Sequence, residues 1–329
     1  MKKGRNLRSV NTDGGVNLQF KLLSAIGIII IVSGHCYHGG MELAYNWFPP
    51  YSYNLALFVF ISGYFYKTDY EENIGKYIWK RTKRLLIPAY LWNIFYGGMV
   101  AFLGLFGFTI GAKPDLYNLF VMPFVDGEAF QYNLGSWFVY PLFLVCIINV
   151  LFRKFLKLIH LDNEFIVLIV YLAIGMIGIN TALENQTAIN GIVKLLVRTM
   201  FFLPCYEFGR FYKAVLEKKD TLNNVAYFAI IFAVQLILLT FCKDLEYTPS
   251  SFTKFNNGFI IPYISSITAI AFWLRVSRLL VPAIGNSKLV RLIADNTYGI
   301  MVNQLVGFMC LKFVFYGLSR ITSGSLFGD

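Results

Sequence analysis

The stretch FKLLSAIGIIIIVSGHCYH, residues 20–38, sets the fold class of this chain. A helix needs about 20 predominantly apolar residues to cross about 30 Å of hydrocarbon, and this stretch has that length and character. Similar apolar blocks follow it at residues 51–66, 85–106, 134–152, 164–180, 190–209, 222–241, 257–274 and 296–318. The pattern predicts an all-α, polytopic transmembrane bundle of about nine or ten helices.

The composition of the 329 residues agrees with this architecture. Hydrophobic residues make up 57% of the chain and charged residues only 14%, against roughly 25% charged residues in soluble proteins. So few charges cannot cover a water-facing domain of this length, which excludes an ordinary soluble protein. A membrane barrel would show weak alternating strands instead of continuous apolar runs. The lipid bilayer is therefore the expected partner of the chain.

The number of helices depends on residues 107–131. A tenth helix could lie there, although Pro114, Pro123 and the acidic residues are more typical of an extramembrane or re-entrant loop.

We divide the chain into a basic N-terminal segment 1–17, a transmembrane domain 18–318 and a short tail 319–329. The five cysteines show no zinc-binding spacing, and we expect no metal site.

Basic residues gather in alternate connections between the apolar blocks. The segments rich in Lys and Arg are 1–17, 67–84, 153–157, 210–219 and 275–291. Because short basic connections are retained in the cytoplasm, the alternation predicts a cytoplasmic N-terminus. The formal net charge of +11 is divided among these loops instead of forming one stripe, so we do not expect nucleic-acid binding.

Two histidines end the first apolar block. His35 and His38 are three residues apart and therefore share a helical face. An ionisable side chain within a membrane span is a functional candidate by default, and an imidazole suits a general base acting on a hydroxyl. The alternative for His35 is a buried histidine hydrogen-bonded to a neighbouring helix. A metal-binding pair is less favoured, because no third ligand of matching depth is evident.

Arg198 is the second ionisable candidate, in the sixth apolar block. We place it at a depth similar to that of His35, where a guanidinium could bind a carboxylate, a phosphate or a developing oxyanion. Its alternative role is a structural ion pair with Glu128, Asp126 or Glu184.

Polar and aromatic residues near these positions are candidates for substrate binding or support. Asn303 and Gln304 lie in the last apolar block, where hydrogen bonds between helices are a common alternative role for amides. Trp137 and Tyr140 begin the fourth block, although aromatic residues are enriched at membrane interfaces for reasons unrelated to function. We place His38 in the same supporting group.

A basic segment, KYIWKRTKRLLIPAY at residues 76–90, precedes the third apolar block. Arg81 and Arg84 share a helical face, with Lys80 beside them, and their forked charges could clamp the phosphates of a nucleotide cofactor. The alternative is that these residues only anchor the helix at the membrane surface.

Five sequence elements together resemble the acyltransferase-3 family of integral membrane O-acyltransferases. They are FKLLSAIGIIIIVSGH, LALFVFISGYFY, YIWKRTKRLLIPAYLW, GSWFVYPLF and NTYGIMVNQ, in this order. The members associated with bacterial exopolysaccharide or capsule modification are the most similar in character. The resemblance implies a protein of the bacterial plasma (inner) membrane that moves an acetyl group from cytoplasmic acetyl-CoA to a sugar hydroxyl of a cell-surface polysaccharide or its lipid-linked precursor.

The same resemblance assigns expected roles to individual residues. The family's first-helix histidine corresponds to His35, which would deprotonate the acceptor or carry the acetyl group transiently. Its paired arginines correspond to Arg81 and Arg84, which would hold the phosphates of acetyl-CoA. Its intramembrane tryptophan corresponds to Trp137.

This chain departs from the family pattern at two positions. Ser24 occupies a position where the family usually has an arginine, and Lys21 or Arg198 could supply the missing cation. Gln304 occupies a position where the last helix often has a histidine, so a proton-transfer role is not expected there.

A transporter or flippase for a polar lipid-linked sugar is the alternative function, with His35 and Arg198 lining its path.

Overall fold

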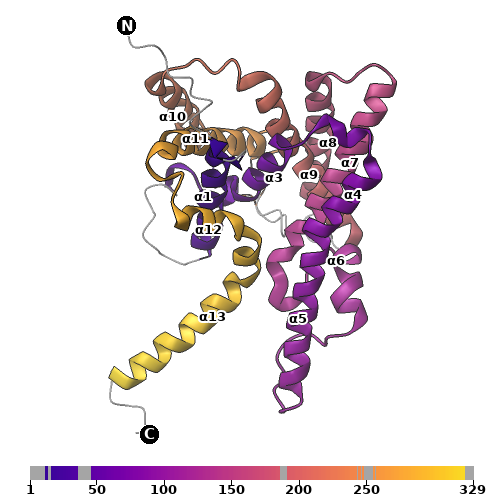
Figure 1. Cartoon of the computed structure of the whole chain (residues 1–329), viewed down its shortest axis with the longest axis vertical. Helices are drawn as coiled ribbons and strands as arrows, with labels where there is room; N and C mark the ends of the chain where they lie inside the picture. The colour runs from indigo at the N-terminus through magenta and orange to yellow at the C-terminus, as the bar shows by residue number, and fades with distance from the viewer. Residues whose placement is uncertain are drawn as a thin grey trace.

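The computed structural model describes residues 12–13, 16–35, 46–185, 191–242, 244–245, 247, 255 and 257–322. Most of these residues are helical (Figure 1), which confirms the all-α prediction. Within the described ranges the only strands are β1 (Thr12–Asp13) and β2 (Val16–Asn17), a two-residue antiparallel pair. The Asn17 side chain accepts a hydrogen bond from the Phe20 amide and caps the first helix.

Every predicted apolar block contains a helix. The main helices are α1 (Leu18–Gly34), α3 (Asn54–Tyr64), α4 (Ile74–Arg81), α5 (Ile87–Gly104), α7 (Val139–Leu158), α8 (Glu164–Glu184), α9 (Gly191–Phe211), α10 (Asn224–Phe241), α11 (Ile261–Ile284), α12 (Lys288–Asp295) and α13 (Thr297–Thr322). Short helical turns join them, namely η1 (Pro50–Ser52), η2 (Thr68–Glu71), η3 (Thr82–Leu86), η4 (Tyr117–Val121), α6 (Met122–Val125), η5 (Gln131–Phe138) and η6 (Tyr212–Leu216). Within residues 107–131, a continuous helical stretch at 116–125 comprises η4 and α6, and it is too short to cross a membrane.

Six helical stretches in the described residues are long and apolar enough to cross a membrane. They are residues 74–104, 131–158, 164–184, 224–241, 261–284 and 297–318. Helices α1 and α3 are apolar but shorter. Helix α9 is not among the six, and charged residues, including Arg198 and Glu207, are spread along its length. The number of clear spans is therefore lower than the number of apolar blocks.

Several of the predicted connections overlap helices, and residues 153–157, for example, lie within α7, which ends at Leu158. Residues 275–291 were expected to form a connection, but α11 continues to Ile284 and includes both Arg275 and Arg278. The helix continues because apolar residues recur around these two arginines, and the arginines find a shared acidic partner in Asp220. A separate short helix, α12, follows.

Helix α9 lies at the centre of the bundle, packed against α3, α7 and α8. Helices α3 and α9 approach so closely that a Cβ on Gly63 would collide with the carbonyl of Tyr206, and one on Gly209 with the carbonyl of Phe60. Small residues allow backbones to approach in this way within membrane bundles. These contacts place the end of α3 firmly against the core.

We expect Gly63→Ala to lower the unfolding temperature of the protein in detergent, since the added methyl group would push α3 away from α9. Gly98→Ala is the matched control, because a Cβ there meets nothing within 4 Å and alanine is the better helix former. Thermal unfolding followed by circular dichroism measures both variants. Equal unfolding temperatures for the two variants would contradict the close packing of α3 on α9.

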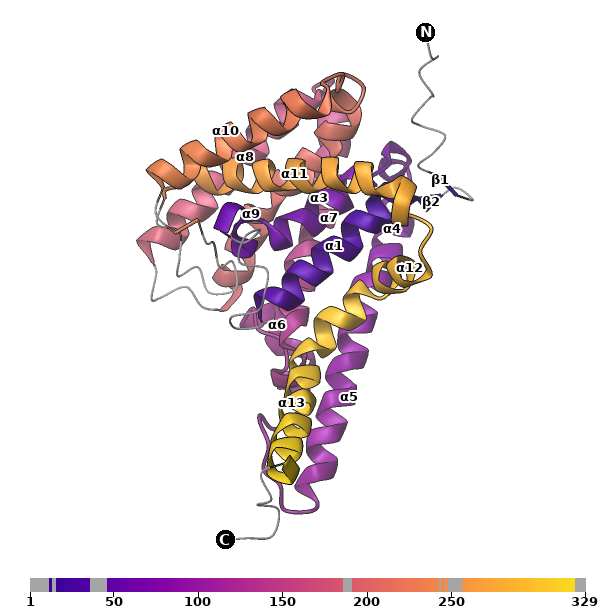
Figure 2. The same ribbon diagram turned by 90° about the vertical axis from the view of Figure 1, so that its left-hand side faces the viewer.

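A second group of helices covers α1. Helices α10 and α11 lie side by side across the upper part of Figure 2, and α1 packs on α11, α12 and α3. Helices α5 and α13 extend away from the rest of the bundle in both ribbon views, and most of their apolar side chains are exposed. Such uncharged, exposed helix surfaces are typical of contact with lipid.

Candidate functional site

A cavity of about 90 Å³ lies at the C-terminal end of α1. It brings together three of the predicted residues, His35, Trp137 and Gln304, which come from α1, η5 and α13. Its other polar lining residues are Tyr51, Asn54 and Tyr247. Segments far apart in the sequence therefore converge on the predicted histidine.

His35 directly follows the last residue of α1 and is exposed at this cavity. Its backbone amide donates to the Val32 carbonyl at 3.1 Å, which continues the helical turn. The imidazole meets the Tyr51 ring edge-on, with 6.3 Å between ring centroids, and the Tyr51 hydroxyl donates to the Gly34 carbonyl at 3.2 Å. The residue as a whole is exposed, which is not what the alternative of a histidine buried between helices predicts. His38 lies outside the described residues.

Trp137 lies between the cavity and Arg198. The guanidinium carbon of Arg198 is 4.4 Å from the centroid of a Trp137 ring, a cation–π contact that is strong when desolvated, and Arg198 is 0% exposed. Arg198 also donates to the Gly127 carbonyl and pairs with Glu128 at 3.7 Å. The Glu128 pair named as the alternative is thus present. Arg198 is not among the residues that line the cavity. It contacts Trp137, which does line the cavity, and so supports that ring without reaching the cavity itself.

A buried hydrogen-bond network holds the segment η5 that carries Trp137. Ser136 Oγ donates to Asn133 Oδ1 at 2.5 Å and lies 3.0 Å from the Tyr298 hydroxyl on α13. Asn133 Nδ2 donates to Asn93 Oδ1 at 2.6 Å and to the Ala89 carbonyl at 3.0 Å on α5. Because a satisfied buried network resists rearrangement, the tryptophan is fixed between α5 and α13.

The predicted supporting residues divide into two groups. Gln304 lines the cavity, and its Oε1 is buried without a hydrogen-bond partner among the described residues. Asn303 instead accepts from the Tyr96 hydroxyl at 2.6 Å and donates to the Gly299 carbonyl, so it joins α13 to α5 as the alternative proposed. Tyr140 packs against the rings of Tyr90 and Phe124, away from the cavity lining.

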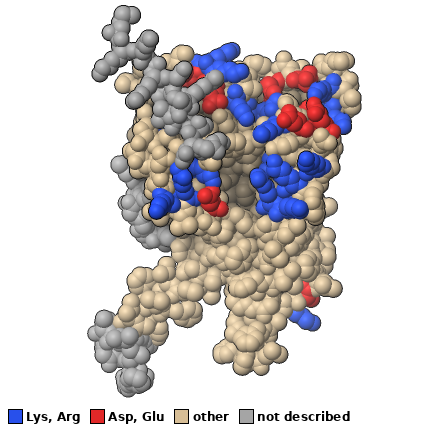
Figure 3. All heavy atoms as spheres, in the orientation of Figure 1, with Lys and Arg blue, Asp and Glu red and all other residues tan. Residues whose placement is uncertain are grey.

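The three basic residues of the α4 region also differ in environment. Lys80 and Arg84 are exposed, whereas Arg81 is half-buried, with its guanidinium carbon 5.1 Å from the centroid of the Tyr77 ring. Arg81 Nε is buried without a hydrogen-bond partner in the described part of the chain. Figure 3 shows a hollow on this face between the basic groups over α4 and over α12. Basic groups therefore lie on both sides of this hollow, which favours the approach of an anion.

A buried ion network lies near the same end of the bundle. Arg153 on α7 donates to both oxygens of Glu207 on α9, at 2.7 and 2.6 Å, and to Glu164 at 2.7 Å. Arg210 also donates to Glu164, at 2.8 Å, and its guanidinium lies over the Tyr66 ring. The sequence interpretation missed this network, although an acid at position 207 within an apolar block was a visible signal.

The sequence interpretation also missed Tyr51, Asn54 and Tyr247 as cavity residues. Asn54 lies at the start of α3 and is only 7% exposed, so a polar residue at the beginning of the second apolar block was the available signal. Nothing in the sequence indicates that Tyr247 would reach His35, since it belongs to the connection between α10 and α11.

The comparisons with known proteins agree with this geometry. The family model described as an acyltransferase domain, of the acyltransferase-3 type, matches residues 17–323. The chain belongs to the acyltransferase-3 family. No curated protein and no solved structure gives a significant match to the chain. Together with the long apolar helices, family membership makes this chain a membrane acyltransferase.

Proposed function

We propose that this chain is a membrane O-acetyltransferase that moves an acetyl group from cytoplasmic acetyl-CoA to a sugar hydroxyl of a cell-surface polysaccharide or its lipid-linked precursor. The observation that carries the proposal is the meeting of His35, Trp137 and Gln304 at one cavity in a chain of this family. The basic connections favour a cytoplasmic N-terminus, and the family resemblance favours the bacterial inner membrane.

The donor would enter from the basic face. Arg81 is the best-placed phosphate ligand, because its guanidinium is half-buried and Nε has no partner among the described residues. The exposed Lys80 and Arg84 would add charge at the surface, where they attract a polyanion such as acetyl-CoA. The pantetheine arm, which is long and nearly uncharged, would then extend between the helices toward His35.

The chemical step needs one proton acceptor and one group that stabilises negative charge. The His35 imidazole would take the proton from the acceptor hydroxyl as its oxygen attacks the thioester carbonyl. The resulting oxyanion would collapse with loss of the coenzyme A thiolate, which recovers the proton from the imidazolium. In the alternative course, the acetyl group is transferred first from coenzyme A to a ring nitrogen of His35 and then from that nitrogen to the acceptor hydroxyl.

The neighbouring residues would position the reactants. The Gln304 and Asn54 amides carry N–H groups that can hydrogen-bond the oxyanion or the sugar, and sugars commonly stack on flat aromatic faces such as Trp137. Arg198 would keep that ring in place and contribute a positive field through it. A direct contact between Arg198 and the oxyanion stays a prediction.

Acetyl-CoA binding distinguishes the acyltransferase from the transporter alternative. The purified protein in detergent should unfold at a higher temperature with acetyl-CoA, because a ligand that binds the folded state stabilises it by mass action. A transporter of lipid-linked sugar would show no such shift. Mass spectrometry of the surface polysaccharide from cells with and without this protein would identify the acetylated sugar.

We expect the double variant Arg81→Ala with Arg84→Ala to raise the apparent KM for acetyl-CoA roughly 10- to 100-fold, since hydrogen bonds to charged groups contribute about 1.5–3 kcal/mol. The kcat should change little, because these residues bind the donor far from the reacting carbonyl. Lys76→Ala, an exposed change on the same helix, is the control and should leave KM unaltered. An unchanged KM in the double variant would reduce the segment to a membrane anchor.

A further inference from the structure

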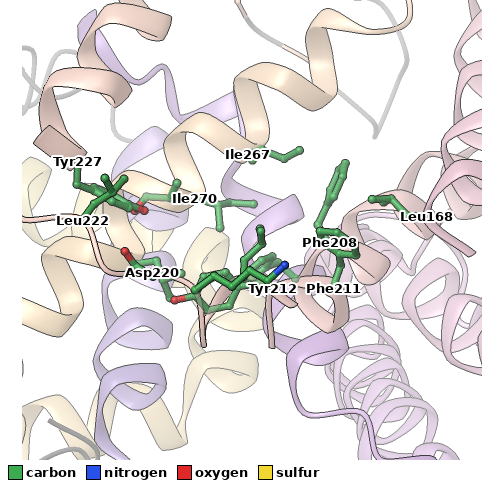
Figure 4. A pocket seen from close by; sticks show the side chains of 14 residues that line it. Leu168, Phe208, Phe211, Tyr212, Asp220, Leu222, Tyr227, Ile267 and Ile270 are labelled. Atoms are coloured by element: carbon green, nitrogen blue, oxygen red, sulfur yellow. The ribbon is translucent and has the colours of Figure 1, made fainter. Parts of the chain in front are cut away.

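A second cavity, of about 400 Å³, is far larger than the one at His35. It lies where α8, α9 and η6 meet α10 and α11, and among the described residues the two cavities share no lining residue. Figure 4 shows Leu168, Phe208 and Phe211 on one side of this space, with Ile267 and Ile270 facing them across it. Its volume falls within the range of about 300–1,000 Å³ that is usual for ligand sites.

The body of this cavity is suited to a hydrocarbon chain. Its walls are mostly aliphatic and phenylalanine side chains, which offer few partners to water or to a polar ligand. Three of the apolar lining residues, Leu216, Leu222 and Ile267, are exposed, so the cavity has an apolar opening on the outside of the bundle. A chain that entered from the surrounding lipid would exchange one apolar environment for another, so its gain would come from the dispersion contacts that it restores along the cavity walls.

One end of the cavity is charged. Asp220 lines it and accepts from Arg275 at 2.6 Å and from Arg278 at 2.9 Å, and Arg278 also donates to the Tyr212 hydroxyl at 3.1 Å. Two guanidinium groups on one carboxylate leave a net positive charge. The exposed Lys219 lines the same end and adds to it. This end therefore attracts an anion, and guanidinium groups match phosphate well.

We propose that this cavity binds an anionic phospholipid of the bilayer, with one acyl chain between α9 and α11 and its phosphate at Lys219 and Arg278. An apolar body joined to a cationic end fits an amphiphile with a negative head, and basic pockets between membrane helices recognise such heads. Helix α10 packs mainly on α11, so this lipid joins the α10–α11 pair to the α8–α9 core. The site is separate from acetyl transfer and does not depend on the proposed function.

The test compares lipids of different charge on the purified full-length protein. Native mass spectrometry should show one phosphatidylglycerol retained at an energy that strips phosphatidylcholine. The unfolding temperature in detergent should rise with added phosphatidylglycerol and change less with phosphatidylcholine. Equal retention and equal thermal shifts for the two lipids would overturn the proposal, as would a free fatty acid that matches phosphatidylglycerol.

Matched variants locate the lipid. Ala271→Phe fills the cavity and should abolish retention of phosphatidylglycerol, whereas Leu236→Phe, on the exposed side of α10, should not. If Ala271→Phe fails to fold, Leu222→Trp at the opening serves the same purpose. Lys219→Glu should weaken phosphatidylglycerol binding at least tenfold more than Lys218→Glu, an exposed neighbour outside the lining with the same change in charge. Unchanged retention in the filled variant, or equal effects of the two lysine changes, would contradict the assignment.

Discussion

His35→Gln is expected to lower the rate of acetyl transfer by roughly 10²- to 10⁴-fold, the usual contribution of general acid–base catalysis. Glutamine keeps much of the size and hydrogen-bonding capacity of histidine but cannot accept the hydroxyl proton. His35 follows the last residue of α1 and is exposed as a whole, so we expect the unfolding temperature to stay near that of the wild type. The kcat of the purified protein, followed by release of free coenzyme A, measures the effect.

His160→Gln is the matched control for this experiment. His160 is also exposed but follows α7, on a connection outside the lining of the His35 cavity. The control should acetylate at the wild-type rate. If the His35→Gln protein is folded and as active as the wild type, His35 is not the general base. The transporter would then be the favoured alternative.

Glu207→Gln is expected to destabilise the fold by about 3–5 kcal/mol, the usual effect of removing one partner from a buried ion pair. Glu207 is 0% exposed and binds Arg153 through both oxygens, so a neutral amide would leave that guanidinium with Glu164 as its acidic partner. Such a change lowers the folding equilibrium constant more than a hundredfold. Equilibrium unfolding in mixed micelles measures the difference.

Two further variants distinguish the effect of breaking the buried ion network from the effect of losing a negative charge anywhere in the protein. Glu184→Gln, on an exposed residue at the end of α8, should alter stability by less than about 0.5 kcal/mol. The pair Arg153→Met with Glu207→Leu should recover much of the loss, because replacing both partners by apolar residues is often neutral or stabilising. If the double variant is as unstable as Glu207→Gln, unpaired charge is not the cause.

The positions of the helices could be predicted because each crossing requires a long apolar block, and this requirement is local in sequence. The central place of α9 could not be predicted in the same way. Its charged residues did not point to a central position, yet Arg198 and Glu207 are buried because their partners, Glu128 and Arg153, come from other segments. Ion pairing between distant segments leaves no periodic pattern in the sequence.

Part of the candidate site could be predicted because polar residues within apolar blocks are visible in the sequence. His35, Trp137 and Gln304 were singled out from polarity in apolar blocks and from family resemblance, and the bundle brings them to one cavity. The burial of Arg81 beside the exposed Arg84 was not evident, because both share one helical face in the sequence pattern and only tertiary packing separates them. The contact of Arg198 with Trp137 likewise depends on how η5 meets α9.

The length of α1 determines how far the two substrates must travel. The helix has 17 residues, which at about 1.5 Å per residue span roughly 25 Å, less than the roughly 30 Å of hydrocarbon in a bilayer. In the proposed orientation, the imidazole that follows it would stop short of the surface of the far leaflet. In the proposed reaction, a thioester arriving from the inner side would then cross only part of the membrane thickness, and a bulky glycan could remain outside while a single hydroxyl reached the imidazole.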